Sequence, residues 1–212
     1  FEIGDFKITP YLVDHSATDA YAFLVEADGK RVLYSGDFRA NGRKSKLFDK
    51  MIEDENLKNI DVLLMEGTML QRNNDEFPTE KSVEDKIYET IKENNQISFM
   101  IGSSQNIDSI VSAYRASKKA KKIFVVDIYT AWILEKVKIV SSSVPNIFWD
   151  DVKVVRNFGG NYYKKIKDNG EYFTDFKYKL FKKENVIDLD TIIENPSNYL
   201  LKVSKGKWIA PT

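Results

Sequence analysis

The sequence has no cysteine and a single histidine, His15, among its 212 residues. Without cysteine, neither a disulfide framework nor a thiolate zinc cluster can form, so a bound metal would use nitrogen and oxygen ligands. No run reaches the roughly 18 apolar residues that a membrane-spanning helix requires. The chain opens without methionine, and its first residues lack the charged, apolar and small-residue succession of a signal peptide. The lack of a membrane-spanning run and of a signal-peptide pattern favours a cytoplasmic protein.

Neither sign of charge is in excess, because 32 basic residues balance 32 acidic ones. This balance gives no global sign of nucleic-acid binding. A hydrophobic share of 42% and a charged share of 30% exclude the disordered, collagen-like and membrane classes. One segment, 162–183, interleaves lysines with aromatic residues, as single-strand-binding grooves do. An amphipathic surface whose aromatic rings enter the core has the same composition, so both interpretations stay open.

The first third of the chain has the pattern of a small antiparallel sheet. Three segments have strand composition: 6–13, 20–26 and 31–35. Asp28-Gly29 lies between the last two segments and is a hairpin turn signal. A polar, helix-compatible segment, 43–55, leads to the apolar run 61–65. Such a continuous run is typical of a strand that is buried on both faces.

Farther along the chain, helical and strand patterns alternate. They follow one another over five segments: 79–91, 97–101, 107–114, 123–126 and 129–140. The strand at 97–101 is expected to be buried, and Thr79 can cap the first helix. Short strands are also expected at 152–155 and 199–203, with a turn at 195–198. Alternation of this kind produces right-handed crossovers and a parallel sheet, so the sequence predicts an α/β fold that follows a β-rich opening.

Three residues able to bind metal or transfer protons follow predicted strands: His15, Asp37 and Glu66. Strand ends are where α/β folds gather active sites. Imidazole nitrogen and carboxylate oxygen suit zinc and similar divalent ions. Gly36 and Gly67 stand beside the two carboxylates and let the backbone turn sharply or approach closely. Taken singly, a histidine is more often a hydrogen-bonded structural residue, Gly-Asp is a common turn, and a glutamate after a strand often caps a helix.

Taken together, these segments resemble a known family. His15-Ser16 before a hairpin, then YSGDFR at 34–39 and LLMEGT at 63–68, look like the metallo-β-lactamase fold in its β-CASP branch, which holds RNA and DNA nucleases. The resemblance implies a partial metallo-β-lactamase αββα sandwich over residues 1–74. It also implies that residues 75–212 form the inserted β-CASP-like α/β domain with a parallel sheet.

The resemblance also implies a site. In the family, the histidine that matches His15 is a metal ligand, and the aspartate that matches Asp37 bridges two zinc ions. The acidic residue that matches Glu66 supports catalysis. The complete enzyme would hydrolyse phosphodiesters with water activated by the two zinc ions.

A second motif extends the resemblance to the substrate. Ser103, Ser104, Gln105 and Asn106 look like the strand-to-helix loop that contacts nucleic-acid phosphate in the RNase J relatives. Backbone N–H groups at a helix start supply such a contact. The implied partner is therefore RNA or another single-stranded nucleic acid, and no membrane partner is implied.

The chain lacks the histidine-rich motifs that supply most zinc ligands in the family, because it contains one histidine. We therefore expect a chain truncated at both ends, with His15 and Asp37 as its clear ligands. By itself it should bind zinc weakly or not at all and should be inactive. Two alternatives remain: a hydrolase of the same fold that acts on a substrate other than nucleic acid, or a degenerate, non-catalytic binding module.

Overall fold

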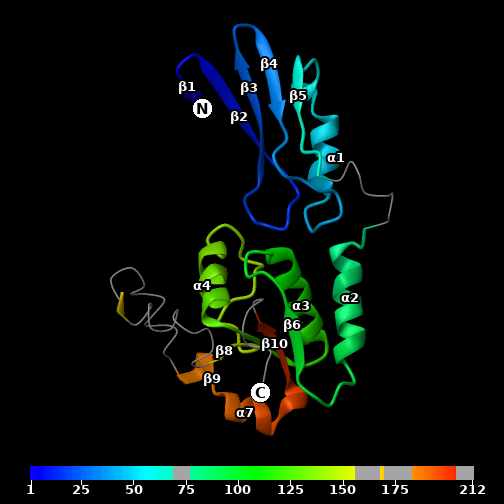
Figure 1. Ribbon diagram of the computed structural model, residues 1–212, viewed down its shortest axis with the longest axis vertical. Helices are drawn as coiled ribbons and strands as arrows, with labels where there is room; N and C mark the ends of the chain where they lie inside the picture. The colour runs from blue at the N-terminus through cyan, green and yellow to red at the C-terminus, as the bar shows by residue number, and fades with distance from the viewer. Residues whose placement is uncertain (69–76, 156–167, 170–182, 204–212) are drawn as a thin grey trace. The chain divides into compact units, whose positions relative to one another are not determined.

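The computed structural model describes residues 1–68, 77–155, 168–169 and 183–203 and divides into two compact units, Phe1–Lys81 and Ser82–Thr212. The described residues of each unit form a five-stranded sheet, and helices accompany both sheets, so the chain is α/β (Figure 1). Among these residues, no helix is long and apolar enough to cross a lipid bilayer. The lysine- and aromatic-rich segment 162–183 lies almost entirely outside the described residues.

The first unit has a mixed sheet in the order β1–β2–β3–β4–β5. Its strands are β1 (Glu2–Ile3), β2 (Phe6–Leu12), β3 (Tyr21–Ala27), β4 (Lys30–Tyr34) and β5 (Val62–Leu64). Neighbouring strands from β1 to β4 are antiparallel, which confirms the antiparallel opening. Asp28 and Gly29 have positive φ and turn the chain between β3 and β4. The helix α1 (Lys46–Glu53) and the 3₁₀ turn η1 (Glu55–Leu57) then lead to β5, which pairs parallel with β4.

The predicted burial of 61–65 on both faces is wrong. The three residues of β5, Val62–Leu64, are between 46% and 57% exposed. The physical reason is position, because β5 is the edge strand of the described sheet and none of its side chains joins the core cluster of this unit. The buried core of this unit is small: Val13, Ala22 and Leu33 form a cluster with a rim of partly buried side chains, and Leu24 is also buried. Apolar composition alone therefore does not place a strand in a core.

The second unit has a fully parallel sheet in the order β6–β10–β7–β8–β9. Its strands are β6 (Ser98–Ile101), β7 (Ile123–Val126), β8 (Val152–Val155), β9 (Val186–Ile187) and β10 (Tyr199–Val203). The accompanying helices are α2 (Glu80–Ile91), α3 (Ile107–Lys119), α4 (Ile128–Val137) and α7 (Leu189–Glu194), with 3₁₀ turns η2 (Lys183–Asn185) and η3 (Pro196–Asn198). The alternating pattern thus predicted the parallel sheet correctly. The final strand, however, is inserted between β6 and β7.

Successive residues of the inner strands face opposite sides of this sheet. Phe124 and Leu200 pack in a core that includes buried residues of α3 and α4. Val125 and Leu201 pack on the other side with Ile192 of α7. The two faces are therefore covered by different helices, as the two-residue repeat of a strand requires.

The strand β6 departs from the prediction that 97–101 is buried. Phe99 and Ile101 are 56% and 54% exposed, although Ser98 is buried. As with β5, the reason is that β6 lies at the edge of its described sheet. The inner strand β7, in contrast, has three fully buried residues, Phe124, Val125 and Val126.

Replacing Phe124 by alanine should lower the free energy of unfolding by about 3–5 kcal/mol, because its fully buried ring would leave a cavity. Phe99→Ala is the matched control on the exposed edge strand, with an expected change within about 1 kcal/mol. Urea unfolding followed by circular dichroism measures both values. Equal losses in the two variants would contradict this assignment of the core.

Candidate functional site

Three strands of the first sheet, β2, β4 and β5, have their carboxyl ends on the same side of the sheet. β2 and β4 both run antiparallel to β3, so they share one direction, and β5 runs parallel to β4. The chain segments that follow these three strands therefore leave the sheet on the same side. His15, Asp37 and Glu66 stand in these segments, a few residues after each strand end. Strand direction thus places the three predicted residues beyond the carboxyl ends of β2, β4 and β5, at the same end of the sheet.

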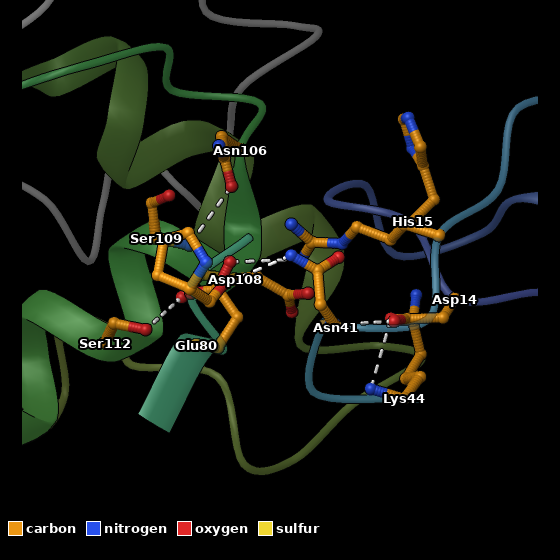
Figure 2. A network of polar contacts seen from close by, with 12 residues as sticks. Asp14, His15, Asn41, Lys44, Glu80, Asn106, Asp108, Ser109 and Ser112 are labelled. Atoms are coloured by element: carbon orange, nitrogen blue, oxygen red, sulfur yellow. Dashed lines mark hydrogen bonds and ion pairs between the residues drawn. The ribbon is translucent and has the colours of Figure 1, made fainter. Parts of the chain in front are cut away.

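The segments that follow β2 and β4 are tied together at Asp14. The amide of Arg39 donates to the backbone oxygen of Asp14 at 2.7 Å. Asp14 is 1% exposed, and its carboxylate accepts hydrogen bonds from the amides of Gly42 at 2.7 Å and Lys44 at 3.2 Å (Figure 2). Asp14 therefore holds this loop in shape. Its place beside the only histidine was visible in the sequence, but its structural role was not predicted.

His15 is partly exposed, and its ring points away from the Asp14 carboxylate (Figure 2). The Nδ1 atom accepts a hydrogen bond from the amide of Ala17 at 3.3 Å. In a neutral imidazole the other nitrogen, Nε2, then carries the proton. A metal-ligating histidine usually donates its second N–H instead. His15 would have to give up the contact with Ala17 to bind a metal through Nε2.

Asp37 and Glu66 line one hollow of about 320 Å³ beside β4 and β5. Apolar residues form much of the remaining wall: Leu63, Leu64 and Met65. The hydroxyl of Thr68 donates to Oε2 of Glu66 at 3.3 Å. The structure therefore brings the two predicted carboxylate residues into a common, partly apolar hollow.

Ser35 joins the two strand ends that carry these carboxylates. It is 2% exposed, and its amide donates to the backbone oxygen of Leu64 at 2.9 Å. Its hydroxyl accepts from the amide of Glu66 at 3.3 Å and donates to the backbone oxygen of Gly36 at 2.8 Å. Sequence reasoning did not select Ser35, although a small polar residue directly before Gly-Asp was a usable signal.

The described residues do not form a complete zinc site. Among them, no group of three histidine, aspartate or glutamate side chains is placed to hold a metal ion. A catalytic zinc ion needs about three protein ligands and water. His15 and Asp37 therefore do not fit a zinc ion by themselves, and no catalytic step through zinc follows from them.

The predicted phosphate-binding loop belongs to the second unit and joins β6 to α3. Ser103 and Gln105 are exposed, whereas Ser104 is 3% exposed. The side chain of Asn106 caps α3 by accepting from the amide of Ser109 at 3.1 Å (Figure 2). The four residues thus have different roles: two face solvent, one is buried and one caps a helix.

The partner of buried Ser104 is a lysine that sequence reasoning missed. Lys202 is completely buried, and its ammonium group donates to Oγ of Ser104 at 2.5 Å and to Oγ1 of Thr130 at 2.9 Å. The Asp127 carboxylate lies 3.7 Å from Nζ. Burial lowers the pKa of Lys202, and the charge of Asp127 opposes this shift. A single lysine inside the apolar run YLLKV was the available signal.

Gly36→Ala should destabilise the first unit more than Gly29→Ala, a substitution of the same kind in the β3–β4 hairpin turn. Gly36 has a φ of +58°, and a Cβ atom there would lie 2.7 Å from the backbone oxygen of Tyr21. Gly29→Ala is the matched control, because Gly29 has a φ of +70° but open space around it. We expect a loss of about 1 kcal/mol for Gly29→Ala and at least about 2 kcal/mol for Gly36→Ala. Equal losses in urea unfolding would show that the approach of Tyr21 is unimportant.

Lys202→Met should change how stability depends on alkaline pH. The pKa of Lys202 is lowered by burial in the folded chain, while its ordinary value is 10.5. Between these two values the unfolded chain binds more protons than the folded chain, so the wild type should gain stability relative to Lys202→Met as pH rises. Urea unfolding of both proteins, from neutral pH to about pH 10.5, measures the difference. If the difference in free energy of unfolding between the wild type and Lys202→Met does not change with pH, the pKa of Lys202 is not lowered in the folded chain.

Neither a protein-family model nor a curated protein sequence matches this chain. Among solved structures, the chain is similar to a protein of unknown function from Enterococcus faecalis V583, with a TM-score of 0.71 and 18% sequence identity. The match covers 99% of this chain and 43% of that one, so the chain spans less than half the length of the solved protein. At this level of identity, the likeness shows a shared α/β fold.

Proposed function

We propose that this chain is part of a zinc-dependent hydrolase that cleaves RNA or another single-stranded nucleic acid. The observation that carries the proposal is that β2, β4 and β5 have their carboxyl ends at the same end of the first sheet, so the segments with His15, Asp37 and Glu66 all leave the sheet there. Active sites of α/β proteins gather at such strand ends. The order and spacing of the three residues also agree with the resemblance to the β-CASP branch of the metallo-β-lactamase fold.

The hollow between β4 and β5 supports a cation site. Two carboxylates, Asp37 and Glu66, line it and make its surface negative. Carboxylate oxygen is a suitable ligand for zinc and other divalent ions. Because the described residues do not complete a zinc site, the proposal requires further ligands in the full-length protein. The chain by itself should therefore be inactive.

The substrate part of the proposal depends on the second unit. The loop at the start of α3 exposes Ser103 and Gln105, and backbone N–H groups at a helix start attract phosphate. We expect this nuclease to act in the cytoplasm and to have no membrane partner. Its oligomeric state is left open by the proposal.

One observation favours the second candidate function, a non-catalytic binding module. The Nδ1 atom of His15 accepts from Ala17, which is not the arrangement of a ready metal ligand. In such a module, His15 and Asp37 would be relics of a metal site, and nucleic-acid binding would not depend on them. Substitution of Asp37 separates the two functions.

Asp37→Asn should weaken zinc binding by at least about tenfold and abolish RNA hydrolysis by the full-length protein, because the variant loses a charged ligand. Asp28→Asn is the matched control: it removes the same charge at the β3–β4 turn and should change neither property. Calorimetric zinc titration and cleavage of a fluorescent RNA oligonucleotide measure the effects. Hydrolysis that persists in Asp37→Asn would exclude the metal role of Asp37. A full-length wild-type protein that binds RNA but neither binds zinc nor hydrolyses RNA would favour the binding module.

A further inference from the structure

A lysine is buried inside the second sheet, where its neighbours along the strand are leucines and valine. Lys202 lies on β10 between β6 and β7, and none of its side-chain surface is exposed. Its ammonium group contacts Ser104 in the β6–α3 loop and Thr130 in the first turn of α4. The hydroxyls of Ser104 and Thr130 are also 2.8 Å apart. The lysine therefore ties three chain segments together.

This arrangement is costly for stability. Transfer of an ammonium group from water to a protein interior loses hydration, and a nearby carboxylate recovers only part of it. Asp127 supplies that carboxylate at 3.7 Å. A well-packed apolar side chain at the same position would carry no such cost, and buried ion pairs replaced in this way often leave a protein equally or more stable. The buried charge therefore points to a role other than stability.

The position of the lysine in the sheet indicates what that role is. Connections from β6 to β7 and from β7 to β8 advance across the sheet, whereas the connection through α7 returns the chain and inserts β10 between β6 and β7. In α/β sheets, ligands bind beyond the carboxyl ends of strands where the direction of connection reverses. Lys202 lies near that end of β10, next to the β6–α3 loop.

The contact with the lysine also sets the orientation of the loop. Ser104 points inward to Lys202, and its neighbours Ser103 and Gln105 are exposed. The hydroxyl of Ser103 accepts from the amide of Gln105 at 3.2 Å, which closes a tight turn around Ser104. With Asn106 capping α3, the loop has a defined shape at the helix start.

From these contacts we infer that Lys202 is a positioning residue, which acts through Ser104 to hold the loop 103–106 in the shape that presents it to RNA phosphate. The inference rests on the proposed function, because it takes this loop as the surface that contacts nucleic acid. Lys202 itself is buried and does not touch the ligand.

Hydrogen exchange tests the positioning role without any ligand. Lys202→Met should speed amide exchange across 103–109 by at least about tenfold. Lys122→Met is the matched control, because Lys122 is also buried but donates to backbone oxygens of Asn94 and Ser197, and it precedes β7 at the opposite end of the sheet. This control should leave exchange in the loop unchanged. Unchanged exchange in Lys202→Met would overturn the inference.

RNA affinity, measured by fluorescence anisotropy with a labelled single-stranded oligonucleotide, tests the consequence. Lys202→Met and Ser104→Ala should each weaken binding about tenfold, and the double variant should be no weaker than either, because both remove the same contact. Additive losses, or an equal loss in Lys122→Met, would overturn the role of Ser104 as the link. If Lys202→Met does not fold, Ser104→Ala provides the same two measurements.

The two measurements separate the inference from the proposed function. A loop that loosens in Lys202→Met while RNA affinity stays unchanged overturns the inference and leaves the nuclease proposal standing. A wild type that does not bind RNA removes RNA from the proposed function and overturns the presentation of this loop to RNA phosphate, even where the loop loosens in Lys202→Met.

Discussion

The antiparallel pairing of β3 with both β2 and β4 decides where the polar residues of the first unit lie. Because two reversals restore the original direction, β2 and β4 end at the same edge, and β5 follows β4 in parallel. The segments with His15, Asp37 and Glu66 therefore emerge together, although about fifty residues separate the first from the last. Any chemistry at this end of the sheet therefore depends on the antiparallel pairing of β3 with β2 and β4.

Buried polar side chains hold the loops at both candidate sites. In the first unit, Asp14 accepts from the backbone amides of Gly42 and Lys44. In the second, Lys202 donates to the hydroxyls of Ser104 and Thr130. Each group is removed from water and satisfied by protein partners, as buried polar groups require. These loops are thus shaped by buried hydrogen bonds, while their neighbouring residues stay available to solvent.

The largest errors of sequence reasoning concern burial at sheet edges. The apolar runs 61–65 and 97–101 have the composition of strands covered on both faces, yet β5 and β6 are edge strands with exposed side chains. The run 123–126 has the same composition, and its last three residues are buried, because β7 lies inside its sheet and a core cluster packs on each face. A local pattern reports that a segment is extended and apolar, but strand order decides what covers it.

By itself, the sequence determined the local structure: the strands 123–126, 152–155 and 199–203 were predicted with the bounds they have, and the turn at Asp28-Gly29 was evident. These features depend on side-chain periodicity and backbone preference within a few residues. Only the tertiary structure decided that Lys202 meets Ser104, 98 residues earlier, and that Ser35 joins the end of β4 to Glu66. Such contacts arise when strands pair across the chain, and no local pattern encodes that pairing.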